Sequence, residues 1–101
     1  MLNVDRTQEN GALMIALEGE LDTLSAPDFE DMLEPMLTDA QSLTLDIEKL
    51  EYISSAGLRI LLAAEQAMEE KGAEKVRVLN ANSTIRNILD ITGFMDVLAV
   101  E

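Results

Sequence analysis

The chain has 101 residues, no cysteine and no histidine, and its 20 acidic and 7 basic residues give a net charge of −13. The missing residue types exclude disulfides, thiolate metal sites and any Ser-His-Asp or Cys-His catalytic arrangement within the chain. The acidic charge repels phosphate backbones and anionic lipid headgroups, so neither nucleic acid nor a membrane is expected as a partner. We also expect no cofactor and no bound metal.

Apolar residues make up 48% of the chain, enough for one domain, residues 1–101, with a modest hydrophobic core. Residues 1–5 lack the basic start and apolar centre of a signal peptide, and no apolar run approaches the length of a membrane span. We therefore expect a cytoplasmic protein.

The first elements in chain order form a β-hairpin. Short apolar runs at residues 2–4 and 12–17 flank Asn10-Gly11, and both of these residues tolerate the positive φ that tight hairpin turns need. The second strand is expected to end at Gly19.

A helix is expected next. Ser25 and Asp28 have the spacing of a capping box, with Ser25 as the N-cap, and Pro27 falls in the first turn, where a missing N–H costs little. Pro35 predicts a kink, or an end near Glu34 with a further turn beyond. The apolar positions at helical spacing are Ala26, Phe29, Met32, Leu33, Met36 and Leu37.

The middle of the chain predicts a strand and a helix. Residues 43–47 alternate with period two, as a half-buried strand does, and a short loop is expected after them. The most regular helix of the sequence follows at residues 56–71, with Gly72 placed to close it in the left-handed conformation. The charged residues at the end of this helix, Glu65 among them, are expected to be solvated.

The last third of the chain predicts one more strand, at residues 76–79, and a helix capped by Asn82 or Ser83 that ends before Gly93. Residues 97–100 predict a small edge strand. Strands and helices alternate after the hairpin, which indicates an α/β fold: a mixed sheet of about four to five strands with helices packed on it.

The segment with the strongest functional signal is the turn from Ser54 to Gly57, where a strand passes into the helix at residues 56–71. The first N–H groups of a helix have no partner within it, and the helix dipole places positive charge there. A phosphate on Ser54 or Ser55 would meet these groups, and Gly57 would let another backbone approach closely. The simpler alternative is that a serine here only caps the helix.

Three blocks of the sequence resemble segments of STAS domains. Gly19-Glu20-Leu21-Asp22 with Ser25-Ala26 resembles the family's G-E-L-D…(S/T)-A segment. Residues 52–59 resemble its phosphorylation segment, often written D-S-S-G-L, and residues 88–94 resemble the end of its third helix, L-x-L-T-G-L/F. The blocks keep the family's order, and the similarity covers almost the whole chain.

The chain resembles, in particular, the bacterial anti-sigma factor antagonists. This resemblance implies that it binds an anti-sigma factor that is also a GHKL-type serine kinase, and that binding releases the sigma factor. Phosphorylation of a serine by the same kinase would abolish binding, and a PP2C-type phosphatase would restore it. The resemblance also implies that the chain catalyses nothing itself.

The site residues implied by the resemblance depend on how the turn is aligned. With Gly57 aligned to the glycine of D-S-S-G, Ala56 stands where that version has its accepting serine, and Ser55 and Ser54 precede it. The expected phosphorylation site is therefore Ser55, with Ser54 as the second choice. The expected partner-binding residues are Asp22, Ser54, Ser55, Ala56, Gly57 and Arg59.

The charges expected around the turn are mostly acidic. Asp46, Glu48 and Asp22 are expected near the serines, so a complementary partner face should be basic. A phosphate would add about −1.5 to −2 charges at this surface. Arg59 could contact the partner or the phosphate, or it could simply be the exposed residue of an amphipathic helix.

Two alternatives remain open at this point. The chain could be a STAS subunit of a lipid-transport or signalling-scaffold complex, in which no serine is modified. It could also be an enzyme with a serine nucleophile, but it has no Gly-x-Ser-x-Gly elbow and no histidine to activate a serine. Phosphate-binding motifs of the Walker or dinucleotide type are absent as well.

Overall fold

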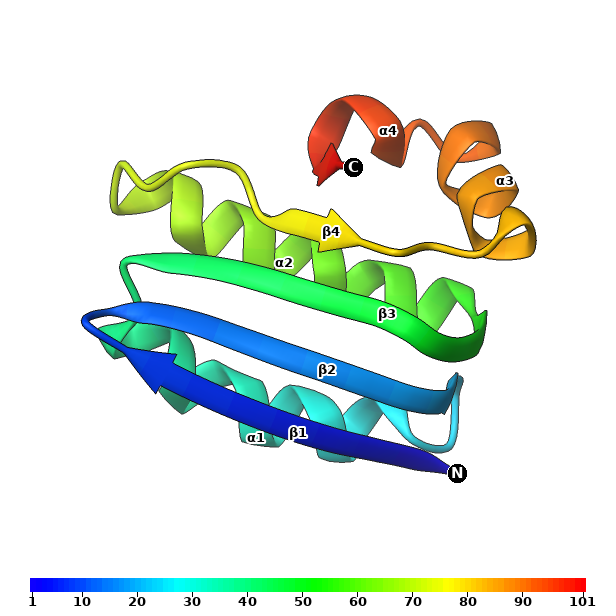
Figure 1. The fold of residues 1–101 in the computed structure, drawn as a ribbon, viewed down its shortest axis with the longest axis horizontal. Coiled ribbons are helices and arrows are strands. Elements are labelled where there is room, and N and C mark those ends of the chain that lie inside the picture. Colours follow the sequence, from blue (N-terminus) through cyan, green and yellow to red (C-terminus); the bar gives the residue numbers. More distant parts are fainter.

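The computed structural model describes all residues from 1 to 101 and contains a five-stranded mixed sheet (Figure 1). Strands β1 (Leu2–Glu9) and β2 (Ala12–Leu21) form an antiparallel hairpin. The remaining strands, β3 (Ser42–Ile53), β4 (Arg77–Leu79) and β5 (Ala99–Val100), are each parallel to the strand before them. The strands lie in the sheet in their order along the chain, and the predicted α/β fold is confirmed.

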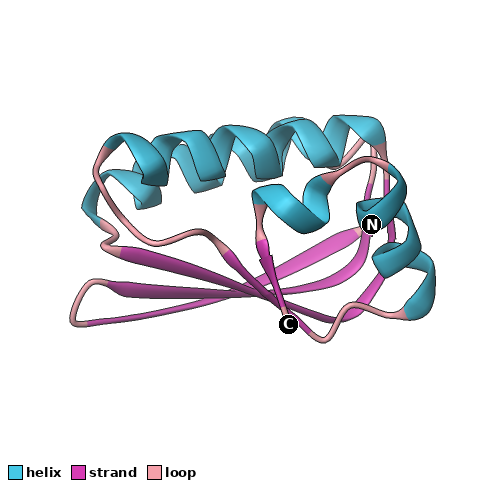
Figure 2. Ribbon diagram, turned by 90° about the horizontal axis from the view of Figure 1, so that it is seen from above, coloured by secondary structure: helices cyan, strands magenta, loops and turns pink.

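The two long helices, α1 (Ala26–Asp39) and α2 (Ser55–Glu70), lie side by side on one face of the sheet (Figures 1 and 2). Helix α3 (Ser83–Ile91) and the four-residue α4 (Phe94–Val97) follow β4, and Figure 2 shows the opposite face of the sheet without a helix. The third helix ends before Gly93, as predicted, and Asn82 is its N-cap, with its Oδ1 accepting a hydrogen bond from the Ile85 N–H at 2.8 Å. The short helix α4 was not predicted.

The core lies between the sheet and the helices. Strand β2 shows why, because its buried leucines and isoleucine alternate with exposed residues, as the two faces of a strand require. The core contains 24 buried residues from every strand except β1 and β5, together with the three longer helices and the connecting segments. The largest fully buried side chains include Phe29, Ile15, Leu45, Leu50, Met68 and Leu89.

The hairpin turn is as predicted, with positive φ angles of 53° at Asn10 and 85° at Gly11. The expected ends of two strands were wrong. Strand β2 continues past Gly19 to Leu21, and β3 continues through the expected loop to Ile53, because Leu21 pairs with Ile53 and both side chains are buried. Register shifts between these strands break the period-two pattern that would have indicated their full length.

Helix α1 begins where predicted, after Ser25, and differs from the prediction at its other end. It runs through Pro35 to Asp39 and does not end near Glu34, because Leu33 and Leu37 are both buried against the core on either side of the proline. Ser25 is the N-cap residue, as predicted, but its side chain makes no capping bond, so the capping box with Asp28 was wrong. The hydroxyl of Ser25 donates instead to the carbonyl oxygen of Glu20 at 2.8 Å.

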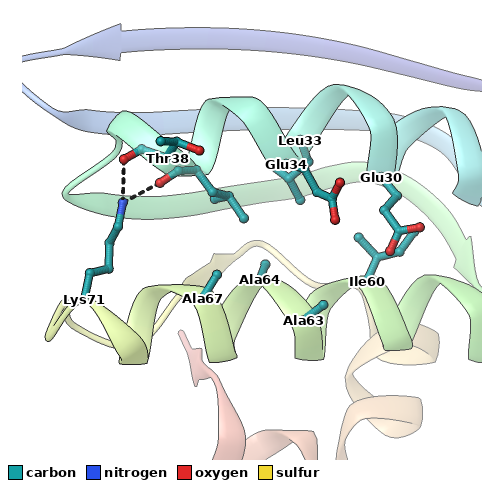
Figure 3. Close-up of a pocket in the computed structure, with 10 residues that line it drawn as sticks. Glu30, Leu33, Glu34, Thr38, Ile60, Ala63, Ala64, Ala67 and Lys71 are labelled. Carbon is teal, nitrogen blue, oxygen red and sulfur yellow. Dashed lines mark hydrogen bonds between the residues drawn. The ribbon is translucent and has the colours of Figure 1, made fainter.

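The far ends of α1 and α2 are joined by Lys71, whose Nζ donates to the carbonyl oxygens of Leu37 and Thr38 (3.1 Å) (Figure 3). It also donates to the carbonyl oxygen of Ala40 at 2.8 Å. Carbonyls at the end of a helix lack the usual i+4 partner, and the lysine supplies a donor to each of these, although that of Leu37 also accepts a backbone bond of 3.3 Å from Ala40. Helix α2 itself closes at Gly72, which has a φ of 75° as predicted. Three small side chains of α2 line the narrow hollow between the two helices in Figure 3: Ala63, Ala64 and Ala67.

Glu65 was expected to be solvated, and the structure buries it with only 6% of its surface exposed. Its Oε1 accepts a hydrogen bond of 2.8 Å from the backbone N–H of Val76, immediately before β4. The carboxylate therefore satisfies a backbone donor that the start of the short strand would otherwise leave unpaired.

Candidate protein-binding site

The turn from Ser54 to Gly57 lies at the edge of the sheet where the parallel strands β2 and β3 both end. The backbone N–H of Ser54 donates to the carbonyl oxygen of Leu21 at 2.9 Å. Asp22, which directly follows Leu21, is therefore beside the serine turn, although more than thirty residues separate them in the sequence. In α/β sheets, the carboxyl ends of parallel strands are the usual place for binding sites.

Gly57 has a structural role within the turn. A Cβ atom at this position would lie 2.8 Å from Cγ of Leu21 and 2.9 Å from Cγ1 of Ile53, closer than carbon atoms pack. The first turn of α2 therefore presses directly on the ends of β2 and β3. Gly57 is buried, so the backbone that approaches it closely belongs to this chain, and its neighbours form the exposed surface.

The two serines of the turn have different surroundings. Ser54 is the N-cap of α2, and its Oγ accepts a hydrogen bond of 3.3 Å from the Gly57 N–H while the residue is partly buried. Ser55 is the first residue of the helix, is exposed, and makes no side-chain hydrogen bond within the chain. The hydroxyl of Ser55 is thus the one available to another protein. Ala56 is partly buried against the core.

Asp22 orders the loop between β2 and α1. Its Oδ1 accepts hydrogen bonds of 3.0 Å from the backbone N–H groups of Leu24 and Ser25, and one of 3.2 Å from the Ser25 hydroxyl. The hydrogen bond from the Ser25 backbone, followed by those from Leu24 and the hydroxyl, lowers the pKa of Asp22 below its ordinary value. The carboxylate is therefore an ionised and oriented part of the surface beside Ser54.

Arg59 lies on α2 four residues after Ser55 and is exposed, and neither ion pair of the structure involves it. Side chains four residues apart in a helix are neighbours on its surface. The guanidinium group is therefore on the same side of α2 as the Ser55 hydroxyl and is available to a partner or a phosphate.

Asp46 and Glu48 do not belong to this site, contrary to expectation. Asp46 precedes Ile53 by seven positions in β3, which corresponds to about 23 Å along an extended strand. Its Oδ1 accepts hydrogen bonds of 3.1 Å from the Asn80 side chain and from the Glu48 backbone. Both carboxylates are therefore on the middle of the sheet, away from the serine turn.

Two exposed apolar side chains flank the turn and were not recognised as site residues from the sequence. Leu24, in the loop ordered by Asp22, is 88% exposed, and Tyr52, which pairs with Glu20 near the end of β3, is 47% exposed. Both side chains are therefore apolar surface that a bound protein could cover. Leu24 could have been noticed because it falls between Asp22 and the helix and outside the apolar stripe of α1.

The structure contains no group of three or more acidic side chains arranged to hold a metal ion. None of its helices combines the length and the apolar character needed to cross a lipid bilayer.

Comparison with known proteins identifies similar chains. The family model described as "STAS domain" matches residues 3–101. An anti-sigma-B factor antagonist of Staphylococcus aureus is 27% identical over 100 residues, covering 98% of this chain and 92% of the relative.

Two solved structures share the fold. An anti-sigma factor antagonist from Mycobacterium paratuberculosis superposes with a TM-score of 0.87 at 21% identity, covering 99% of this chain and 85% of the other. The phosphorylated form of the Bacillus cell fate determinant SpoIIAA superposes with a TM-score of 0.78 at 17% identity, covering 98% of this chain and 91% of the other. The chain therefore shares its overall fold with these two structures.

Proposed function

The chain belongs to the STAS domain family, and on that premise we propose that it is an anti-sigma factor antagonist, switched off by phosphorylation of Ser55. In this role it binds an anti-sigma factor that is also a GHKL-type serine kinase, and thereby releases a sigma factor for transcription. A PP2C-type phosphatase returns it to the binding state. The protein acts in the cytoplasm and is not an enzyme.

The observation that carries this proposal is the difference between the two serine hydroxyls. Ser54 uses its hydroxyl to cap α2, whereas Ser55 presents a free hydroxyl on the exposed first turn of the same helix. A kinase needs an accessible hydroxyl, so Ser55 is the acceptor and Ser54 is the residue that shapes the turn. The relatives named anti-sigma factor antagonists support the role, and the SpoIIAA structure is of a phosphorylated form.

The position of Ser55 also explains how phosphorylation acts without unfolding the protein. A phosphate there lies at the positive end of the α2 dipole, beside N–H groups that have no helical partner. The fold accommodates the group, so its effect is on the bound partner. Three hydrated oxygens and about −1.5 to −2 charges in a close contact cost desolvation and space. A loss of about 3 kcal/mol there weakens binding roughly a hundredfold.

Site-directed phosphorylation tests this proposal. Each purified GHKL-type kinase encoded in the source genome is incubated with ATP and the wild-type chain, Ser55→Ala or Ser54→Asn. Asparagine is as good an N-cap as serine but has no hydroxyl, so Ser54→Asn preserves the turn. We expect one kinase to add a single phosphate to the wild type and to Ser54→Asn, and none to Ser55→Ala.

The opposite results have clear meanings. If Ser55→Ala is still phosphorylated and Ser54→Asn is not, the acceptor is Ser54. No phosphate from any of the kinases would contradict the proposed switch and favour an unmodified STAS subunit of a lipid-transport or scaffold complex.

A further inference from the structure

A hollow lies beside the serine turn and shares Asp22 and Leu24 with the candidate site, but most of its lining lies outside that site. The N-terminal half of β1, the Asp22–Ser25 loop and the first turns of α1 enclose an open hollow of about 620 Å³. Its floor and walls are mainly apolar, with Phe29 buried at the base and Leu2, Met32 and the exposed Leu24 around it. This surface is called the β1–α1 hollow below.

The mouth of the β1–α1 hollow is acidic. Asp22 and Asp28 both line it, and the one positive group there is the N-terminal ammonium of Met1, which is paired with Oε1 of Glu20 at 3.4 Å. Asp22 also lies beside Ser54, because Ser54 is hydrogen-bonded to Leu21 at the end of β2. The hollow is therefore continuous with the surface that carries Ser55, and a single partner can cover both.

We propose that the β1–α1 hollow receives an apolar segment of the anti-sigma factor kinase that carries basic residues at its edge. This inference rests on the proposed function and adds a second contact for the same partner. The apolar floor buries the segment's hydrophobic side chains, and the two carboxylates pair with its basic residues. Met32 suits such a contact, because its unbranched side chain adapts to the shape of what binds it.

The proposal also explains the exposure of Leu24. The loop ordered by Asp22 holds this side chain 88% exposed at the wall of the hollow, between the carboxylate and α1. Burial of this side chain in a complex removes its apolar surface from water, which is worth about tenfold or more in affinity for a fully buried leucine.

Binding measurements on four chains test the inference. The probes are the purified GHKL-type kinases of the source genome, and the kinase that binds the wild type most tightly is used for the comparison. The chains are the wild type, Leu24→Ser, Ser55→Asp and the control Ile91→Ser, which removes a side chain that is also largely exposed (75%) but lies at the end of α3. We expect Leu24→Ser to weaken binding about tenfold or more and Ile91→Ser to change it less than about twofold. Melting temperatures close to that of the wild type show that the variants are folded.

A second measurement does not depend on any substitution. Methyl-labelled methionine gives separate NMR signals for Met32, in the hollow, and for Met14, which is 44% exposed on the uncovered face of the sheet. Kinase binding should shift the signal of Met32 and leave that of Met14 in place.

The outcomes separate this inference from the proposed function. If Ser55→Asp weakens binding but Leu24→Ser binds like the wild type and the Met32 signal does not move, the hollow is not part of the interface while the antagonist role stands. If no kinase binds the wild type, both are overturned.

Discussion

The backbone N–H of Ser54 lies 2.9 Å from the carbonyl oxygen of Leu21, and this hydrogen bond joins the two segments that form the candidate site. It fixes the Asp22 loop and the serine turn as one surface at the ends of β2 and β3. Leu21 and Ile53, the last residues of these strands, also pack against Gly57. The geometry of the site therefore depends on the packing of the core.

Replacement of Gly57 with alanine should lower the free energy of unfolding by about 1–3 kcal/mol, the usual range for overpacking. The added Cβ would clash with Leu21 and Ile53 at 2.8–2.9 Å, so the start of α2 must move away from the strands. Urea denaturation measures the change. Gln66→Ala at an exposed position of the same helix is the control and should change the stability by less than about 0.5 kcal/mol. Equal stability of Gly57→Ala and wild type would contradict the close packing.

Ser55→Asp should leave the protein as stable as the wild type, or more stable by about 0.3–1 kcal/mol, because it places a negative charge in the first turn of α2. Thermal denaturation at low salt is the measurement. Gln66→Asp, which adds the same single charge at an exposed position about three turns further along the helix, is the matched comparison and should lack this gain. A clear destabilisation by Ser55→Asp would show that the negative charge acts on the fold and not on the partner.

Asp22 should contribute to stability in a pH-dependent way. The hydrogen bond from the Ser25 backbone, with smaller contributions from Leu24 and the Ser25 hydroxyl, holds the pKa of Asp22 below its ordinary value of 3.8. A carboxylate with a lowered pKa in the folded state stabilises the protein above its unfolded pKa, and the contribution disappears as the pH falls through the folded pKa. Asp22→Asn should therefore be less stable than wild type at pH 6, and the difference should shrink below pH about 4.

The control for this pH series is Asp5→Asn, which removes the same charge from β1 without breaking a side-chain hydrogen bond. It corrects for the general relief of repulsion in a chain of net charge −13. A difference between Asp22→Asn and Asp5→Asn that does not change with pH would argue against the role of the Asp22 carboxylate in the loop.

Glu65→Ala should destabilise the protein by about 1–3 kcal/mol, because it leaves the buried N–H of Val76 without an acceptor. Glu65→Gln retains a side-chain oxygen at the same distance from the backbone and should lose less. Chemical denaturation of both variants gives the comparison. If the two substitutions cost the same, the hydrogen bond to Val76 is not what the buried side chain provides.

The elements that were predicted correctly carry their signals locally. Asn10-Gly11 predicts the hairpin, and Gly72 predicts the end of α2, because each residue acts on its own φ. The full length of β3 was hidden because Glu48 and Lys49 are both exposed where the register shifts, so the alternation stops although the strand continues. Glu65 was misjudged because its partner, Val76, is brought to it only by the fold.

The residues of the candidate site also differ in whether the sequence alone could identify them. Ser54, Ser55 and Gly57 were identified from the sequence because helix starts have recognisable residues. The burial of Gly57 against Leu21 and the position of Asp22 beside Ser54 depend on the contact of α2 with the end of β2, which no local pattern encodes.

The most direct test of the antagonist role is the affinity of the anti-sigma factor kinase for the unphosphorylated chain and for the chain phosphorylated at Ser55, measured by calorimetry at the same salt concentration. We predict that the unphosphorylated chain binds and that the phosphate weakens binding about a hundredfold or more. Equal or tighter binding of the phosphorylated chain would contradict the switch.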